Sequence, residues 1–188
     1  MSILDIILLP DERLHQASEP VTTFDANLKK LARDMGETMH AANGIGLAGV
    51  QVAVMKQILV IDVNEVDDEE SESVEERKSK KRKRTGDGIE TYINPKITKT
   101  SGEIEYEEGC LSIPGVYSKV KRARHITVEY NDLDGNLIEE EASGLKAIVL
   151  QHEIDHLNGV IFFDRVGPMQ RMMLTTKYKK LSQQKEED

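Results

Sequence analysis

The nonapeptide QHEIDHLNG, residues 151–159, contains the pattern H-E-x-x-H. His152 and His156 are four residues apart, so a helix places both imidazoles on one face, close enough to share one metal ion. Glu153 directly follows the first histidine, where its carboxylate can reach a metal-bound water without ligating the metal. The pattern predicts metal-assisted hydrolysis by a helix in the C-terminal half of the chain.

The residues around this motif favour a buried or cleft-lining helix. A surface helix with two incidental histidines could also produce so short a pattern. Imidazoles within an apolar segment, however, need polar partners or a metal. The apolar side chains on either side of the motif are Leu145, Ile148, Val149 and Leu150, and then Leu157, Val160, Ile161, Phe162 and Phe163.

A third ligand is expected, because catalytic zinc-type sites usually have three protein ligands and one open position. Two protease patterns place that ligand downstream. The metzincin pattern needs a histidine at the position that Phe162 occupies here. The thermolysin pattern needs a glutamate further along, and Asp164 is the only acidic residue in the apolar run after His156. The single cysteine, Cys110, is a better candidate. A lone cysteine is more often a small buried hydrophobe, but EEGCLSIPG (residues 107–115) indicates a tight, shaped loop after a strand.

Three segments together resemble the peptide deformylases, which remove the formyl group from the N-terminal formyl-methionine of new polypeptides. They are GIGLAGVQ (residues 44–51), EGCLS (108–112) and QHEIDHLNG (151–159), in the family's order and spacing. The similarity runs from about residue 7 to the helix after Pro168. One position departs from the family pattern, because Gly49 replaces the second alanine of the first motif. This change puts the local rigidity of the substrate cleft in question.

The resemblance implies a role for each motif. Cys110, His152 and His156 would hold one divalent metal ion, generally Fe²⁺, which Zn²⁺, Ni²⁺ or Co²⁺ can replace. Glu153 would be the general base, and the Gln51 side chain and the Leu111 backbone N–H would stabilise the oxyanion. The substrate-binding residues implied by the family are Gly44, Ile45, Gly46, Tyr106, Leu145, Ile148 and Val149, with Arg122 as a partner of the acidic loop. The aliphatic members of this set are equally compatible with an ordinary core.

Two other classes of function fit parts of the pattern. A metallopeptidase would use the same zinc-binding helix but would cleave internal peptide bonds. A non-catalytic metal-binding module would have a closed four-ligand site, and the sequence offers no obvious fourth ligand. His15, His40 and His125 lie far from the motifs and are more simply read as surface or core residues.

Composition restricts the setting. The chain has 188 residues, enough for one catalytic domain over residues 1–188, and a formal net charge of −9, which argues against a specific DNA partner. It has one cysteine, and its sequence leads us to expect neither a membrane span nor a secretory signal. We expect a cytoplasmic enzyme that acts on formyl-Met nascent peptides, with the ribosome near its exit tunnel as a further candidate partner.

The order of elements predicts an α+β fold in which antiparallel strands pack around the H-E-x-x-H helix, followed by a terminal helix. Asp25 is the expected N-cap of a first helix that ends near Ala42, and Ser143 is the expected cap of the motif helix, which ends near Gly159. The last helix should run from Pro168 to about Leu181. Strands are expected over residues 57–63, 92–98, 104–108, 116–120, 125–131 and 137–142.

One segment breaks the globular pattern. Residues 64–88 are first acidic, then basic (RKSKKRKR, residues 77–84), and almost devoid of apolar side chains. Such a segment cannot bury itself, so we expect a disordered, solvated insertion between two strands. The basic half would also pass as a nuclear-localisation or nucleic-acid patch, but the adjacent acidic half favours mutual neutralisation.

Overall fold

The computed structural model describes residues 2–63 and 88–186 and has the predicted α+β architecture. The charged insertion expected at residues 64–88 lies outside the described residues, apart from Gly88. The strands are β1 (Gly46–Ala48), β2 (Ile58–Ile61), β3 (Glu90–Ser101), β4 (Ile104–Cys110), β5 (Ile113–Arg122), β6 (His125–Asn131) and β7 (Leu137–Ser143). The helices are η1 (Glu12–His15), α1 (Ala26–Ala41), η2 (Gly49–Val52), α3 (Gly144–Leu157), η4 (Phe162–Arg165) and α4 (Pro168–Glu186).

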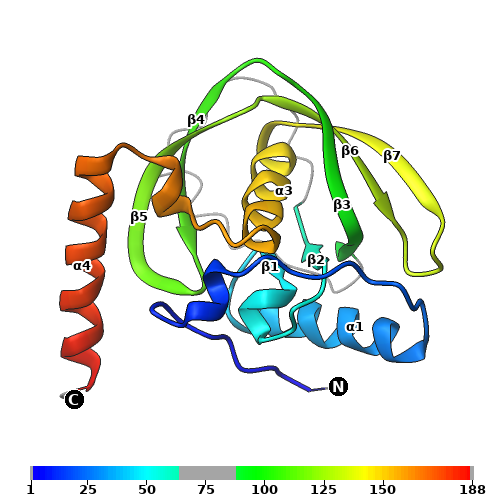
Figure 1. Ribbon diagram of the computed structural model, residues 1–188, viewed down its shortest axis with the longest axis horizontal. Coiled ribbons are helices and arrows are strands. Elements are labelled where there is room, and N and C mark those ends of the chain that lie inside the picture. The colour runs from blue at the N-terminus through cyan, green and yellow to red at the C-terminus, as the bar shows by residue number, and fades with distance from the viewer. Residues whose placement is uncertain (1, 64–87, 187–188) are drawn as a thin grey trace.

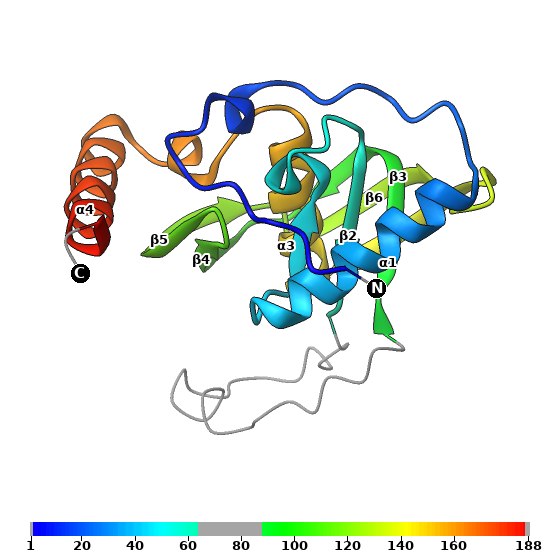
Figure 2. The ribbon, with the colours of Figure 1, turned by 90° about the horizontal axis from the view of Figure 1, so that it is seen from below.

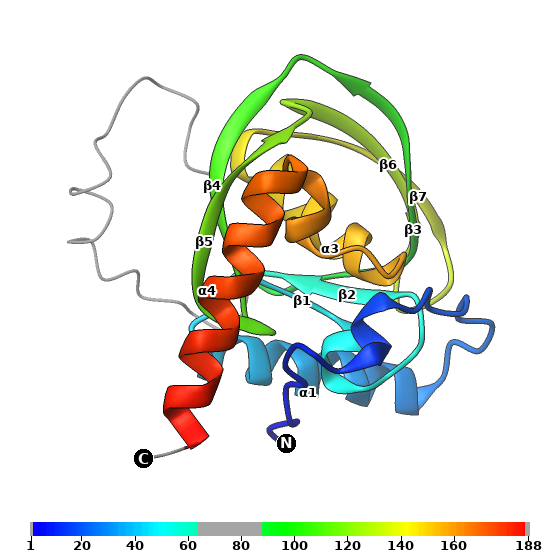
Figure 3. The same cartoon turned by 60° about the vertical axis from the view of Figure 1, so that its left-hand side comes forward.

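The motif helix α3 lies at the centre of the molecule, and strands curve around it (Figure 1). One antiparallel sheet has the order β1-β2-β3-β6-β7, and β4 and β5 form a separate antiparallel pair. The view in Figure 3 shows both sets of strands around α3, with α4 alongside β5. A helix enclosed in this way needs apolar side chains around most of its circumference, which explains the apolar run that contains the motif.

Strand β2 shows why the sheet has a helix on each face. Its four residues, ILVI, are all buried, and neighbouring side chains of a strand point to opposite faces. Leu59 and Ile61 pack in the cluster that includes α3, whereas Ile58 and Val60 pack in the cluster that includes α1. Figure 2 shows α1 lying along the outer side of this part of the sheet. A continuous apolar strand is the expected sequence for a strand covered on both faces.

The predicted ends of α1 are confirmed. The Asp25 carboxylate accepts hydrogen bonds from the backbone N–H groups of Asn27 and Leu28, at 3.0 and 2.9 Å. At the other end Asn43 has a φ of 57°, and the Gly44 N–H donates to the Met39 carbonyl at 2.8 Å. This left-handed residue turns the chain out of the helix and into the first motif.

Other boundaries differ in detail from the predictions. Ser143 is the N-cap residue of α3 by position, but its side chain makes no capping hydrogen bond to the described helix, so that detail of the prediction is wrong. β4 extends to Cys110 and β5 begins at Ile113, so the second motif spans the end of β4 and the tight connection to β5. The short strand β1 was not predicted, because three buried residues are too few to show a period.

The last helix, α4, is longer than predicted and ends at Glu186. Its buried side chains Leu174 and Tyr178 pack in a third cluster with residues of β5 and η4. The Tyr178 hydroxyl also donates to the Leu9 carbonyl at 2.8 Å, so α4 is attached to the N-terminal segment. Among the described helices, none has the length and apolar character that crossing a membrane requires.

Candidate active site

Two segments that are distant in sequence supply the predicted metal ligands. His152 and His156 lie one helical turn apart on α3, with ring centroids separated by 4.9 Å. Cys110 ends β4, and its Sγ lies 3.2 Å from His156 Nε2. One ligand atom of each residue lies within 4.8 Å of the other two. The i, i+4 spacing places the two histidines on one face of α3, and the end of β4 places the cysteine next to them.

This trio fits a divalent metal ion. Ligand atoms around a tetrahedral ion lie about 3.3 to 3.6 Å apart, so small side-chain shifts would close the set. The pKa of His156 lies well below its usual value, because the ring is buried and next to His152, so this imidazole is neutral as a ligand must be. Burial alone would lower the pKa of His152, but hydrogen bonds to Cys110 and Glu108 outweigh it and raise the pKa. The same two acceptor groups, which carry negative charge when ionised, favour a divalent cation there in place of the proton.

A buried ion-pair network holds the first histidine. His152 Nδ1 lies 2.8 Å from Glu108 Oε2, which leaves Nε2 as the nitrogen available to a metal. Arg122 donates two hydrogen bonds to Glu108, at 2.7 and 2.9 Å, and one to Asp155, at 2.6 Å. Burial alone would raise the pKa of Glu108, but the hydrogen bonds from Arg122 and His152 lower it to about 2. The carboxylate is therefore ionised and orients the imidazole ring.

Glu153 is buried, lines the same cleft as Cys110 and His152, and has a carboxylate oxygen without a hydrogen-bond partner. Among the described residues, Glu153 Oε2 and His156 Nδ1 are buried polar atoms without a hydrogen-bond partner. Burial raises the pKa of Glu153 to about 7, although the neighbouring His152 opposes this. A carboxylate with a pKa near neutral can both accept and return a proton. These properties suit a general base better than a carboxylate with a purely structural role.

Gln51 is oriented by its own backbone turn. It lies in η2, and its Oε1 accepts a hydrogen bond from the Ala48 N–H at 2.8 Å. With the carbonyl end held, the Nε2 donor end points to Cys110 Sγ at 3.4 Å and Ser112 Oγ at 3.2 Å. The backbone therefore determines which end of the amide faces the ligand trio, and it is the donor end.

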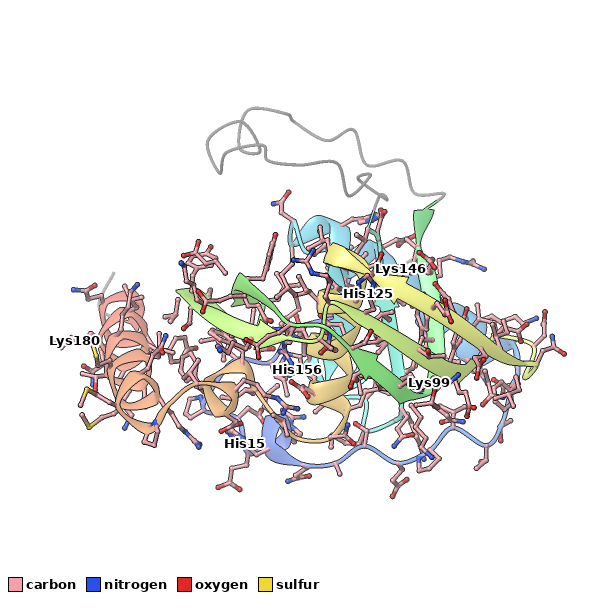
Figure 4. All side chains as sticks on the ribbon, turned by 90° about the horizontal axis from the view of Figure 1, so that it is seen from above. His15, Lys99, His125, Lys146, His156 and Lys180 are labelled. Atoms are coloured by element: carbon pink, nitrogen blue, oxygen red, sulfur yellow. The ribbon has the colours of Figure 1, made fainter. Side chains whose placement is uncertain are left out.

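A cleft of about 660 Å³ opens onto these groups. Its lining includes Gln51, Cys110, Leu111, His152 and Glu153. His156 lies behind this set, fully enclosed, and Figure 4 shows it in the interior on α3. All seven predicted substrate-binding residues line the cleft: Gly44, Ile45, Gly46, Tyr106, Leu145, Ile148 and Val149.

Comparison with known proteins agrees with this geometry. A sequence model of the family described as Polypeptide deformylase matches residues 3–172. The chain belongs to the polypeptide deformylase family. A peptide deformylase of Chromobacterium violaceum is 44% identical over 98% of this chain and 99% of its own length. Another, from Rhizobium meliloti, is 45% identical over 96% of this chain and 94% of its own.

Solved deformylase structures share the fold. The crystal structure of a peptide deformylase from Legionella pneumophila matches with a TM-score of 0.82 at 40% identity, and covers 100% of this chain and 99% of that chain. The peptide deformylase from Ehrlichia chaffeensis in complex with actinonin matches with a TM-score of 0.80 at 41% identity, over 96% and 98% of the two chains. The whole arrangement of strands around α3 is thus the deformylase arrangement.

The departure at Gly49 has a local explanation. An added Cβ would lie 2.9 Å from the carbonyl oxygens of both Val54 and Lys56, and 3.0 Å from Ile58 Cγ2. The Val54 N–H also donates to the Gly49 carbonyl at 2.9 Å. In this deformylase the chain turns back closely over Gly49, so the glycine is tightly packed. The expected loosening of the cleft is therefore not what its surroundings indicate.

Two functional contacts were not recognised in the sequence. Glu108 lies inside the second motif, but only the fold shows that it contacts His152. Gln151 clamps α3 to the β5–β6 connection, because its side chain exchanges hydrogen bonds with the Ala123 N–H and carbonyl at 3.0 and 2.9 Å. Gln151 directly precedes His152 and Glu108 is two positions before Cys110, and this closeness to the predicted ligands was the available signal. The other histidines remain outside the site; His40, for example, pairs with Asp62.

Proposed function

We propose that this chain is a metal-dependent peptide deformylase, which hydrolyses the N-formyl group of formyl-Met polypeptides to formate and a free amino terminus. The observation that carries the proposal is the meeting of Cys110, His152 and His156 beside the partner-free carboxylate oxygen of Glu153, at the base of an apolar cleft. Family membership directs this chemistry to formyl-methionine.

The metal would be held by the Cys110 thiolate and the two imidazoles. A bound divalent ion supplies Lewis acidity, which lowers the pKa of water to about 7 and polarises a carbonyl group. The ligand set suits Zn²⁺ as well as Fe²⁺. We assign Fe²⁺ as the native ion because the family generally depends on iron, with Zn²⁺, Ni²⁺ or Co²⁺ as substitutes.

Glu153 moves the proton. Its carboxylate takes a proton from the attacking water and gives one to the leaving amine nitrogen, so that water and the formyl amide become formate and a primary amine. A pKa of about 7 suits both directions of transfer. Gln51 Nε2 and the Leu111 backbone N–H are the proposed donors to the oxyanion that develops on the formyl oxygen. The orientation of the Gln51 amide supports its part of this assignment.

The peptide part of the substrate would bind as an added strand. β1 forms one edge of the five-stranded sheet in the described part of the chain. Its first residue, Gly46, lines the cleft together with the preceding Gly44 and Ile45. Backbone pairing with such an edge does not depend on side-chain identity, which suits an enzyme that acts on many different nascent chains. The methionine side chain would occupy the part of the cleft lined by Tyr106, Leu145, Ile148 and Val149.

The cellular setting follows from the substrate. We propose one catalytic domain over residues 1–188 that acts in the cytoplasm on peptides emerging from the ribosome. The basic stretch at residues 77–84 is a candidate contact with the ribosome, and it lies outside the described residues. Neither membrane nor specific DNA is needed as a partner for this chemistry.

The deciding experiment is formate release from formyl-Met-Ala by protein purified without oxygen, combined with metal analysis. The proposal predicts about one metal ion per chain and formation of Met-Ala with no further cleavage. A metallopeptidase would instead cut internal bonds of a longer formylated peptide and release no formate. A metal-binding module would retain the ion and turn over neither substrate.

A further inference from the structure

A second polar cluster lies at the other end of α3 from His156. The Lys146 ammonium contacts Glu90 Oε2 at 2.7 Å and Glu140 Oε1 at 2.5 Å. The Tyr92 hydroxyl lies 3.0 Å from Glu90 Oε2 and 3.1 Å from Glu140 Oε2, and the Tyr130 hydroxyl donates to Glu140 Oε2 at 3.2 Å. These five residues, here called the Lys146 cluster, join α3 to β3, β6 and β7.

The Lys146 cluster is partly withdrawn from water. The side chains of Lys146 and Glu140 are 15% and 23% exposed, Tyr92 is fully buried, and Glu90 is 40% exposed. Exposed ion pairs contribute little to a structure, but a pair shielded as Lys146 and Glu140 are is screened less. Burial alone would lower the pKa of Lys146, but hydrogen bonds to Glu140 and Glu90 outweigh it and raise the pKa. One ammonium therefore holds two carboxylates together, and without it those carboxylates would repel each other.

Lys146 occupies the first turn of α3, directly beside the wall of the cleft. Leu145, Ile148 and Val149 stand at helical spacing, so they share one face, and all three line the cleft. Lys146 points to the sheet instead, towards β3 and β7. Figure 4 shows Lys146 and His156 well apart, with Lys146 near the start of α3. A shift of the first turn would move the apolar wall while the ligand end of the helix stays attached through Gln151 and His152.

We infer that Lys146 is a positioning residue that holds the apolar wall of the methionine pocket through the Lys146 cluster. The inference rests on the proposed function for its substrate. A pocket distinguishes side chains by fit, and one extra or missing methylene group in an apolar pocket changes discrimination by about 10- to 200-fold. Displacing Leu145 and Ile148 therefore weakens the preference for methionine more than it slows the chemical step, because Glu153 and the two histidine ligands lie further along the helix and Cys110 lies on β4.

Lys146→Met tests this role, because methionine keeps the length of the side chain and removes its charge. Lys146→Arg restores the charge, and Lys29→Met is the matched control, since Lys29 forms an exposed pair with Asp134. We expect Lys146→Met to raise the KM for formyl-Met-Ala-Ser about tenfold with kcat changed by less than about twofold. Its kcat/KM ratio for formyl-Met-Ala-Ser over formyl-Ala-Ala-Ser should fall to a similar degree. Lys146→Arg should recover most of the preference, and metal content should be equal in all four proteins.

A readout without turnover separates this inference from the proposed function. Amide hydrogen exchange over residues 145–149 should become about tenfold faster in Lys146→Met and stay unchanged in Lys29→Met. Unchanged exchange in Lys146→Met would overturn the inference, even if the wild-type protein released no formate and the proposed function failed. With an active enzyme, a lower melting temperature without any change in KM or in substrate preference would also overturn it.

Discussion

Gly46 lies against the carboxylate of Glu153, and a methyl group on its α-carbon would overlap Glu153 Oε1 and crowd Cδ. A Gly46→Ala substitution must therefore displace the proposed general base. Because a misplacement of about 1 Å can reduce turnover 10²-fold, we expect a kcat loss of about that size with metal content unchanged. Gly167→Ala is the control, since a Cβ there meets nothing within 4 Å. Normal kcat in Gly46→Ala would contradict the contact.

The proton-transfer role of Glu153 can be tested by Glu153→Gln, which keeps the size of the side chain and removes its basicity. We expect deformylation to fall about 10²- to 10⁴-fold, the usual contribution of a general acid–base group. Metal bound per chain should not change, because Glu153 is not in the ligand trio. Glu141→Gln, at an exposed position of β7, is the control. Turnover near the wild-type rate by the metal-loaded variant would rule out the assignment.

Removal of the thiolate should empty the metal site. Cys110→Ala leaves only two imidazoles, and a two-ligand site binds a divalent ion weakly. We expect the variant to lose its metal during dialysis and to release no formate, whereas His125→Ala, on the exposed end of β6, should keep one ion per chain. Metal analysis after dialysis is the measurement. A Cys110→Ala protein that retained its ion and turned over would disprove the three-ligand site.

Arg122 and Lys121 are neighbours in β5 with opposite surroundings, and they make a matched pair of variants. Arg122 is buried between Glu108 and Asp155, whereas Lys121 forms an exposed pair with Glu103. Arg122→Met leaves two buried carboxylates without their cation, and we expect the free energy of unfolding to fall by about 3–5 kcal/mol. Lys121→Met should change it by less than about 1 kcal/mol. Urea unfolding measures both values, and equal losses would contradict the buried network.

The charged insertion should be dispensable for catalysis. β2 and β3 pair antiparallel from Ile58 with Ile93 to Ile61 with Glu90, so a short turn can join them. Replacement of residues 65–85 by a short Gly-Ser linker should leave formate release from a free peptide unchanged. Stability should change little, because each halving of loop length alters the closure free energy by only about 0.6 kcal/mol.

The same linker variant tests the insertion as a ribosome contact. If the basic stretch binds ribosomal RNA, the variant should bind ribosomes more weakly than the parent chain does. Ribosome binding by the parent chain should also weaken as salt is added. Equal binding by the two proteins would favour the solvated insertion that the composition indicates. Activity on the free peptide is the internal control in both cases.

Local patterns in the sequence were sufficient for much of this site. The i, i+4 spacing of His152 and His156 requires only a helix, and the buried segment around them is one. Asp25 caps α1 through contacts two and three residues away, and the ends of β6 match their predicted positions. The three motifs named the family, and the comparisons confirm it. Such features are predictable because the interacting groups are close in sequence and depend on backbone geometry alone.

The tertiary structure decided which distant groups meet. Cys110 and His156 are 46 positions apart, and the thiol at the end of β4 meets the ring on α3 only in the folded chain. The same holds for Glu108 with His152, for Gly46 with Glu153 and for Lys146 with Glu90. These contacts depend on strand register and on the curvature of the strands around α3, which the burial of many side chains determines together. The residues proposed for the chemistry could be named from the sequence, but the groups that orient them became visible only in the fold.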